Sequence, residues 1–160
     1  MRPASLNELK QELKSLSQND LLEICLRLTK YKKENKELLT YLLFEKGNEA
    51  GYIKAIKLEM EEQFGEINKI NMYFIKKSIR KILRSTNKYI KYSGSKETEV
   101  ELLLYFCKVF KESGIRIRSS TTLTNLYENQ LRKITKTISG LHEDLQYDYG
   151  VEVGKLKGEG

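Results

Sequence analysis

The sequence predicts an all-α protein, either a single-domain bundle or a short α-solenoid of about seven helices. Three observations lead to this fold class. The only proline is Pro3, so no proline interrupts a helix in the interior of the chain. Apolar residues recur at spacings of three and four, which is the period of a helix with one buried face. At 160 residues the chain has the size of one domain.

The first half of the chain divides into four predicted helices. A leucine stripe at three- and four-residue spacing follows Ser5, and Ser17 lies three residues before Asp20, close to the pattern of a capping box. Gly47 and Asn48 suit the left-handed end of a third, strongly apolar helix. The predicted ranges are Ser5 to Leu16, Ser17 to Tyr31, Glu34 to Lys46 and Glu49 to Phe64.

The second half is predicted to hold three longer helices. The first runs from Ile67 to Tyr92, and the second, from Lys96 to Glu112, is apolar nearly all round. We interpret 115–118 as a linker. The last helix follows cap candidates at 119–122 and carries the stripe Leu123, Tyr127, Leu131, Ile134, Ile138, Leu141 and Leu145.

This pattern predicts a helical domain over 1–150, with the second, third and sixth helices supplying most of the core. Residues 151–160, rich in glycine and charge, are predicted to be a flexible tail. Cys25 and Cys107 lie in apolar runs and are predicted to be two buried free thiols. The start of the chain lacks a signal-peptide core and no run is long enough to span a bilayer, so the sequence predicts a cytoplasmic protein without a transmembrane segment.

Between Lys76 and Lys91 the chain carries seven basic residues and no acidic one. The charge of this segment, +7, equals the formal net charge of the whole protein. At 100° per residue, six of them share one side of the predicted helix, opposite its isoleucines. They form a stripe about 20 Å long. The six residues of this candidate nucleic-acid or anion site are Lys77, Arg80, Lys81, Arg84, Lys88 and Lys91.

Two interpretations of the stripe remain open. A stripe of one sign can bind nucleic acid, an anionic lipid surface or an acidic protein, and Tyr73, Tyr89 and Tyr92 lie near enough to stack on bases. The alternative is a solvated face that keeps the domain in solution or pairs with the acidic stretches Glu59 to Glu62 and Glu97 to Glu101.

The sequence offers little catalytic chemistry, and it predicts no cofactor. His142 is the only histidine, and its neighbours Glu143 and Asp144 point about 100° apart on a helix, so they cannot bind one metal ion without another helix. Arg116 and Arg118 precede a run of hydroxyl residues at 119–122 that can hold a phosphate or simply cap a helix.

Two stretches resemble a family of all-helical bacterial proteins of unknown function. The first is the opening, from Leu9-Lys10-Gln11-Glu12-Leu13 to Leu28-Thr29-Lys30-Tyr31, and the second is Ser139-Gly140-Leu141-His142-Glu143-Asp144-Leu145 with Tyr147 and Tyr149 behind it. The resemblance implies an all-helical fold and no known activity, and it draws attention to His142.

We therefore predict a non-enzymatic binding or scaffold domain whose candidate contact surface is the basic stripe, with nucleic acid or an acidic protein as partner. One alternative is a metal-dependent or acid–base enzyme centred on His142. Another is a homo-oligomeric protein–protein interaction module, formed through an exposed apolar patch on the third or fourth helix.

Overall fold

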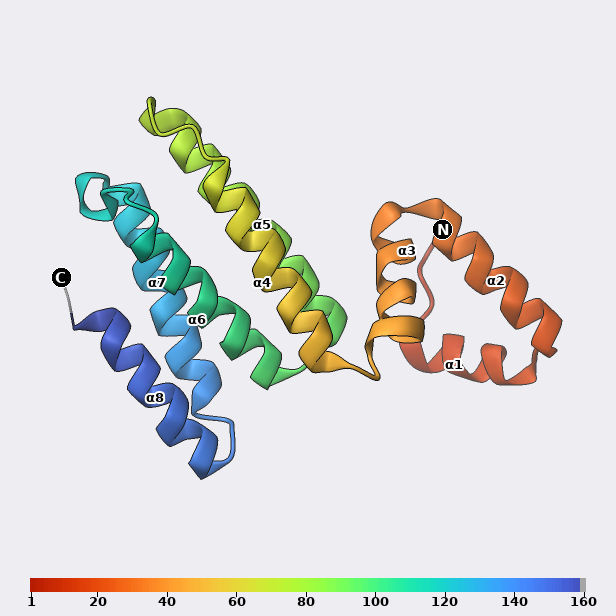
Figure 1. The fold of residues 1–160 in the computed structure, drawn as a ribbon. Helices are drawn as coiled ribbons and strands as arrows, with labels where there is room; N and C mark the ends of the chain where they lie inside the picture. Colours follow the sequence, from red (N-terminus) through yellow and green to blue (C-terminus); the bar gives the residue numbers. More distant parts are fainter. Residues whose placement is uncertain (159–160) are drawn as a thin grey trace. The chain divides into compact units, whose positions relative to one another are not determined.

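The computed structural model describes residues 1–158 and is all-α over this range, which confirms the predicted fold class (Figure 1). The described residues form eight α-helices and two short helical turns, and no strand is present among them. The elements are α1 (Leu6–Ser15), α2 (Gln18–Tyr31), α3 (Lys33–Thr40), the π-turn η1 (Tyr41–Glu45), α4 (Glu49–Gly65), α5 (Met72–Ser93), α6 (Lys96–Glu112), the 3-10 turn η2 (Ile117–Ser119), α7 (Thr121–Ile138) and α8 (Glu143–Lys157).

Contacts divide the chain into two compact units, where the sequence predicts one domain. We call Met1–Phe44 the N-terminal unit and Glu45–Gly160 the C-terminal unit. The structure also differs from the tail predicted at 151–160, because α8 continues to Lys157; residues 159 and 160 lie outside the described range. None of the described helices is both long enough and apolar enough to cross a bilayer.

The N-terminal unit owes its helix boundaries to side-chain caps. Ser5 accepts a hydrogen bond from the Glu8 backbone N–H while the Glu8 carboxylate accepts from the Ser5 N–H, a complete capping box. Ser17 accepts from the Asp20 N–H in the same way. No residue of α1, α2 or α3 is fully buried, so the prediction that the second and third helices supply most of the core is wrong.

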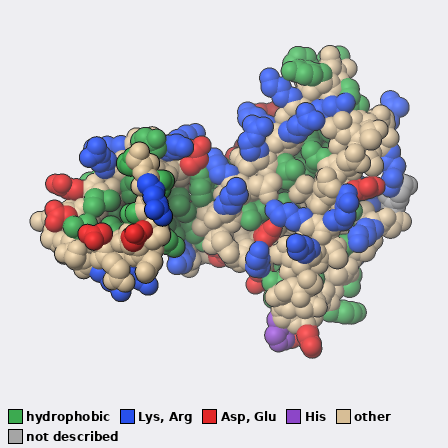
Figure 2. Space-filling view, turned by 180° about the vertical axis from the view of Figure 1, so that it is seen from behind, with side chains coloured by type: hydrophobic (Ala, Val, Ile, Leu, Met, Phe, Trp, Pro, Cys, Tyr) green, Lys and Arg blue, Asp and Glu red, His purple; other side chains and the backbone are tan. Residues whose placement is uncertain are grey.

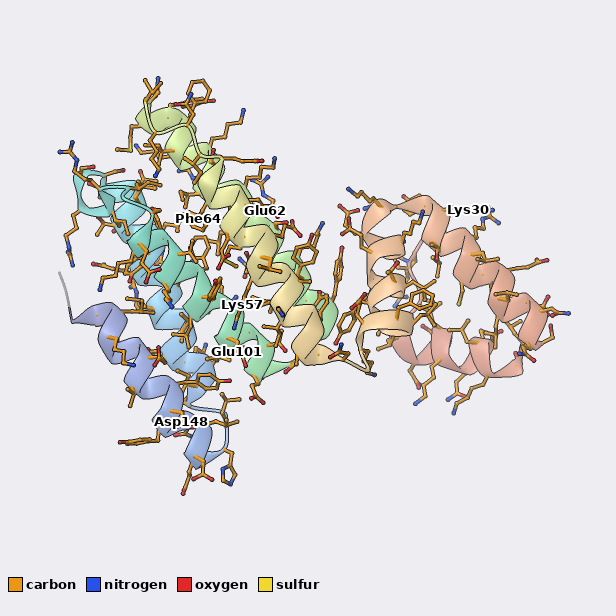
Figure 3. All side chains as sticks on the ribbon, viewed as in Figure 1. Lys30, Lys57, Glu62, Phe64, Glu101 and Asp148 are labelled. Atoms are coloured by element: carbon orange, nitrogen blue, oxygen red, sulfur yellow. The ribbon has the colours of Figure 1, made fainter. Side chains whose placement is uncertain are left out.

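The core of the C-terminal unit surrounds α6, as its nearly all-round apolar pattern predicts. Nine of the residues of α6 are buried, and Leu102, Leu103 and Phe106 are completely inaccessible to solvent. The Phe64 ring of α4 lies 5.6 Å from the Phe106 ring and 6.0 Å from the Phe110 ring, and Figure 3 shows it in the space between α4 and α6. Rings at such separations add to the free energy gained by burying their area.

The other four helices of this unit cover α6 as two hairpins. The α4–α5 hairpin packs on one side of α6 and the α7–α8 hairpin on the other, so that α4, α6 and α8 lie in front and α5 and α7 lie behind in the view of Figure 1. We call α5 and α7 the rear layer and α4, α6 and α8 the front layer. This arrangement decides which polar faces share a surface.

Two helix boundaries of the C-terminal unit differ from their sequence predictions. α5 begins at Met72 rather than near Ile67, because the Asn68 and Asn71 side chains accept hydrogen bonds from the Ile70 and Tyr73 N–H groups, which favours a turn over a helix. The predicted last helix is two helices: α7 ends at Ile138, and α8 starts behind His142.

The connection from α5 to α6 is short because Gly94 adopts a left-handed conformation with φ 67°. This conformation is costly for a residue with a Cβ atom, whereas glycine adopts it freely. The Gly94 N–H donates to the Ile90 carbonyl, and Ser95 then caps α6 by accepting from the Thr98 N–H. The chain therefore reverses direction within a few residues.

Replacement of one completely buried residue of α6 tests the central place of this helix. We expect Leu103→Ala to lower the free energy of unfolding by about 2 to 5 kcal/mol, since it removes buried methyl groups and leaves a cavity. Leu58→Ala is the control, because Leu58 is 52% exposed and its loss should cost less than about 0.5 kcal/mol. Urea unfolding followed by circular dichroism measures both, and equal losses would contradict the assigned core.

Candidate polyanion-binding surface

The six basic residues predicted to share a face do so in the structure. The buried residues of α5 include Ile75, Ile79 and Ile82, which point into the core. At 100° per residue the centre of the basic stripe lies opposite this row, so the cations project from the outer side of the helix. We call the side chains of Lys77, Arg80, Lys81, Arg84, Lys88 and Lys91 the α5 stripe.

Five members of the α5 stripe have no carboxylate partner. Within residues 1–158, none of the five makes an ion pair or a side-chain hydrogen bond, and all are exposed: Lys77, Arg80, Lys81, Arg84 and Lys91. Lys88 is half-buried, and its ammonium lies 5.2 Å from the centre of the Tyr89 ring. The stripe therefore presents a largely uncompensated positive charge to solvent.

Two carboxylates in the acidic stretch of α4 bond to tyrosines and not to the α5 stripe. The Tyr89 hydroxyl donates to the Glu59 carboxylate at 3.0 Å, and the Tyr105 hydroxyl donates to Glu61. The pKa of Tyr89 is raised by burial and by the negative charge of Glu59, and the pKa of Tyr105 is raised to about 12 chiefly by its hydrogen bond to Glu61. Both phenols therefore remain protonated donors at neutral pH.

The acidic stretch of α6 is also engaged elsewhere. Lys57 of α4 forms an ion pair of 3.1 Å with Glu101, and Figure 3 shows these two side chains directed toward one another. The Tyr149 hydroxyl donates to Glu97 at 3.3 Å and lies 3.5 Å from Glu101. Burial and the charges of Glu101 and Glu97 raise the pKa of Tyr149 well above its usual value. These carboxylates connect α4, α6 and α8 within the front layer.

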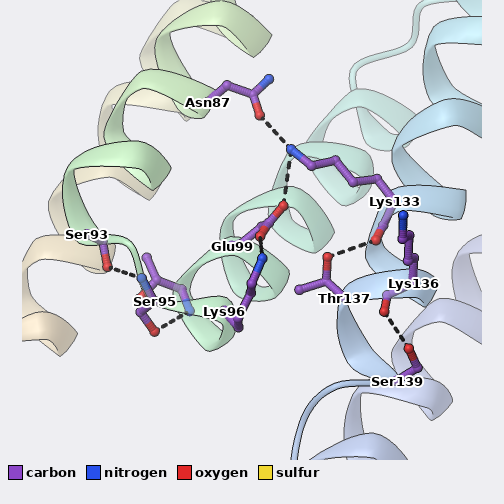
Figure 4. Close-up of polar contacts among 10 residues, drawn as sticks. Asn87, Ser93, Ser95, Lys96, Glu99, Lys133, Lys136, Thr137 and Ser139 are labelled. Carbon is purple, nitrogen blue, oxygen red and sulfur yellow. Dashed lines mark hydrogen bonds and ion pairs between the residues drawn. The ribbon is translucent and has the colours of Figure 1, made fainter. Parts of the chain in front are cut away.

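Glu99 connects the two layers and draws a cation of α7 toward α5. This carboxylate is only 9% exposed, and the Lys133 ammonium lies 3.1 Å from it while Lys96 lies at 3.6 Å. Lys133 also donates to the Asn87 side-chain oxygen of α5 at 3.2 Å, as Figure 4 shows. A buried carboxylate without a cationic partner would destabilise the fold, so the ion pair with Glu99 is strongly favoured. This ion pair fixes the Lys133 ammonium beside α5.

Charge is separated between the two layers of the C-terminal unit. α5 and α7 together carry ten basic residues and one acidic residue, a net charge of +9. α4, α6 and α8 carry seven basic and twelve acidic residues, a net charge of −5. Figure 2 views the molecule from the side of the rear layer, where Lys and Arg side chains clearly outnumber acidic ones.

The basic residues of α7 were missed in the sequence analysis, which considered α5 alone. Arg132, Lys133 and Lys136 lie more than forty positions beyond the α5 stripe in the chain. The available signal was the stretch 121–138, which contains three basic residues and, as its only acidic residue, Glu128. Only the fold shows that this helix lies on the same side as α5.

His142 lies at the start of α8 and not within a helix. Its Nδ1 atom accepts a weak hydrogen bond from the Asp144 N–H at 3.4 Å and lies 3.6 Å from the Asp144 carboxylate. The His142 side chain is 74% exposed. Over residues 1–158, no group of three or more His, Cys, Asp and Glu side chains is arranged to hold a metal ion. The structure thus assigns His142 the role of a helix N-cap.

The hydroxyl groups before α7 cap this helix and hydrogen-bond to the backbone of the preceding loop. Ser120 accepts from the Leu123 N–H, and the Ser119 hydroxyl donates to the Arg116 carbonyl at 2.7 Å. Arg116 and Arg118 are exposed and make no side-chain hydrogen bond or ion pair within the described part of the chain.

Comparison of the chain with protein-family models, curated proteins and solved structures finds no match. The family resemblance drawn from the sequence therefore stays a prediction.

The two cysteines differ in accessibility, although the sequence predicts both to be buried. Cys107 lies in α6 with no accessible surface, and burial raises the pKa of its thiol to about 12. Cys25 is exposed, so the prediction of its burial is wrong. The apolar run around Cys25 belongs to α2, none of whose residues is fully buried.

A thiol reagent at pH 8 distinguishes the two cysteines. We expect one thiol, Cys25, to react rapidly, and Cys107 to react only after unfolding, because attack requires an accessible thiolate. Cys25→Ser should abolish the fast phase, whereas Cys107→Ala should leave it unchanged. Because the folded-state pKa of Cys107 is raised, its contribution to stability is present below pH 9 and is lost as the pH rises toward 12. Two fast thiols would contradict the burial of Cys107.

Proposed function

We propose that the C-terminal unit is a non-enzymatic binding module whose rear layer binds nucleic acid through the α5 stripe. The observation that carries this proposal is the set of five exposed cations without any partner on the only described helix that combines seven basic residues with no acidic one. Such a stripe would bind a phosphate backbone by releasing condensed counterions, without a requirement for base sequence. A cytoplasmic location stays a prediction from the sequence.

The geometry favours nucleic acid over the two other anionic partners. An interfacial helix inserts its apolar face into lipid, whereas the isoleucine row of α5 is buried in the core, with Ile79 completely inaccessible. Protein interfaces usually have an apolar centre that is depleted of charge, and the α5 stripe has no such centre. A straight row of cations about 20 Å long matches the regular charge spacing of a nucleic-acid strand.

An exposed aromatic residue extends the stripe at its N-terminal end. Tyr73 is 66% exposed and lies four residues before Lys77, on the same side of α5. Its ring contacts the ring of Phe74 edge to face, with centroids 5.5 Å apart. An aromatic face beside a row of cations supports binding of single strands, whose unpaired bases stack on such rings.

Oligonucleotide binding across a salt series tests this proposal. If all six cations contact phosphates of a duplex, the logarithm of the association constant should fall with the logarithm of salt concentration with a slope of about −5. A variant with Lys77, Arg80, Lys81, Arg84 and Lys88 changed to glutamine should reduce this slope to about −1 and weaken binding strongly. Fluorescence anisotropy with labelled mixed-sequence single and double strands measures both values.

A matched control separates the stripe from net charge. Changing Lys10, Lys14, Arg27, Lys30 and Lys32 of the N-terminal unit to glutamine removes the same number of charges and should leave binding within about twofold. The proposal is overturned if both variants weaken binding equally, or if the unaltered protein binds anionic vesicles but no oligonucleotide.

A second function, self-association, is favoured by the N-terminal unit. This unit has 44 residues, of which only Tyr41 is fully buried. Thirteen large apolar residues in it are exposed, among them the α1 stripe of Leu6, Leu9 and Leu13. A chain of this length rarely folds stably by itself, and apolar stripes at helical spacing are suited to pack against further helices.

We propose a second copy of the same unit as the partner of these helices. The unit carries eight basic and six acidic residues, so two copies approach without the repulsion that the strongly basic rear layer would create. The apolar rows of α1 and α2 then pack as helix pairs do in a bundle. This would make the protein a dimer that displays two nucleic-acid-binding modules.

The molar mass in solution tests self-association. We expect light scattering to give twice the mass of one chain at micromolar concentration, and Leu9→Gln with Leu13→Gln and Leu22→Gln to give a monomer with unchanged helix content by circular dichroism. Leu58→Gln, which changes an exposed leucine of the C-terminal unit, is the control and should remain dimeric. A monomeric unaltered protein would refute a partner of the same chain.

A further inference from the structure

The C-terminal unit contains a second, concave basic site away from the α5 stripe. Its lining comes from Lys111 at the end of α6, the loop around η2, residues 124–132 of α7 and the last turn of α8, and its volume is about 780 Å³. This volume lies within the range of ligand pockets for small molecules. We call it the α7–α8 pocket.

Positive charge dominates the lining of the α7–α8 pocket. Five cationic side chains and a single carboxylate, that of Glu128, contribute to it, a net charge of +4. Arg116, Arg118 and Lys157 make no side-chain hydrogen bond or ion pair among the described residues. Arg132 donates to the Asn129 side-chain oxygen at 2.6 Å, which restricts the direction of its guanidinium group. Three of the five cations are arginines, and a guanidinium group can donate two parallel hydrogen bonds to two oxygens of one phosphate.

The loop that carries two of these arginines is locked from within. The Ser119 hydroxyl donates to the Arg116 carbonyl at 2.7 Å, and the Thr124 hydroxyl donates to the Ile117 carbonyl at 3.1 Å. Both hydroxyl protons are thereby used on the backbone. These two hydroxyl groups are therefore not free to donate to a bound anion, whereas the side chains of Arg116 and Arg118 are, and the same bonds hold the backbone of these arginines in place.

The floor of the pocket is apolar. Ile115 and Leu131 are buried, and Ile117 and Leu156 are half-buried beside them. The Tyr127 hydroxyl donates to the Leu156 carbonyl at 3.2 Å, which leaves the ring as a wall between α7 and α8. Burial raises the pKa of Tyr127 to about 12, and the nearby Arg118 charge opposes this shift. The phenol is therefore neutral and adds no negative charge to the site.

From this combination we infer that the α7–α8 pocket binds a small phosphate monoester with an aromatic or apolar body. A phosphate dianion complements the charge of the arginine cluster better than a carboxylate, which carries one charge. The organic group of the monoester would lie on the isoleucine and leucine floor, which inorganic phosphate would leave without a contact. The inference does not rest on nucleic-acid binding by the α5 stripe, because the two sites share no residue.

Calorimetric titration with four probes tests the ligand class. Phenyl phosphate and adenosine 5′-monophosphate each carry both parts of the predicted ligand, whereas inorganic phosphate and adenosine carry one part each. We expect the two monoesters to bind at least about tenfold more tightly than inorganic phosphate or adenosine. Equal affinity for inorganic phosphate and for the monoesters would overturn the inference, since it would leave only general attraction of anions.

Paired variants locate the binding. Arg116→Gln with Arg118→Gln should weaken monoester binding at least about tenfold and leave oligonucleotide binding by the α5 stripe largely intact. Lys77→Gln with Arg80→Gln, which removes the same charge from the stripe, should leave monoester binding within about twofold. The two exposed arginine substitutions should not affect folding, which circular dichroism checks. If the stripe variant weakens the monoesters as much as the loop variant does, the pocket is not the site.

Discussion

The structure of the C-terminal unit depends on the wide apolar face of α6, which leaves only a narrow polar side at Glu97, Glu101 and Lys108. At 100° per residue, Val100 and Leu102 lie about 160° apart around the helix, and neither is accessible to solvent. Such a helix is stable in water only when other helices cover most of its surface. The two hairpins do this, and each covering helix must turn its apolar row toward α6. The polar face of every covering helix is thereby forced outward, and on α5 this face is the basic stripe.

The separation of charge follows from the same packing. Lys57 and Tyr149 bond to carboxylates of α6, so these contacts tie α4 and α8 to α6. Glu59 of α4 accepts a hydrogen bond from the Tyr89 hydroxyl of α5, which ties the front layer to the rear layer. Glu99 of α6 pairs in the same way with Lys133 of α7, so carboxylates of the front layer also hold the helices of the rear layer in place. Like charges at spacings of three and four along α5 oppose helix formation slightly, and the buried isoleucine row offsets this cost. Five of the six cations of the stripe are exposed and make no ion pair among the described residues, so they add no ion-pair stabilisation to the fold.

The two units differ in what they offer to a partner. The N-terminal unit is nearly balanced in charge and exposes apolar helix faces, which suits contact with another protein surface. The C-terminal unit buries most of its large apolar residues and exposes charge, which suits the anions that we propose as its ligands. In the dimer that we propose, two rear layers belong to one particle. A long polyanion that binds one of them then binds the second within the same complex, so its overall affinity exceeds that for a single rear layer.

The sequence by itself determined the local features of this protein. The residues Lys96–Glu112 were predicted as a helix with the bounds that the structure shows, and the α5 stripe was predicted residue by residue, because helical period and capping are read from neighbouring positions. Only the tertiary structure decided what is buried and what converges. It placed Cys25 and the helices around it outside any core, brought Lys133 to Asn87, and assembled the α7–α8 pocket from the loop before α7 and the end of α8. Burial and convergence depend on which helices meet, and residues forty positions apart carry no periodic signal of that meeting.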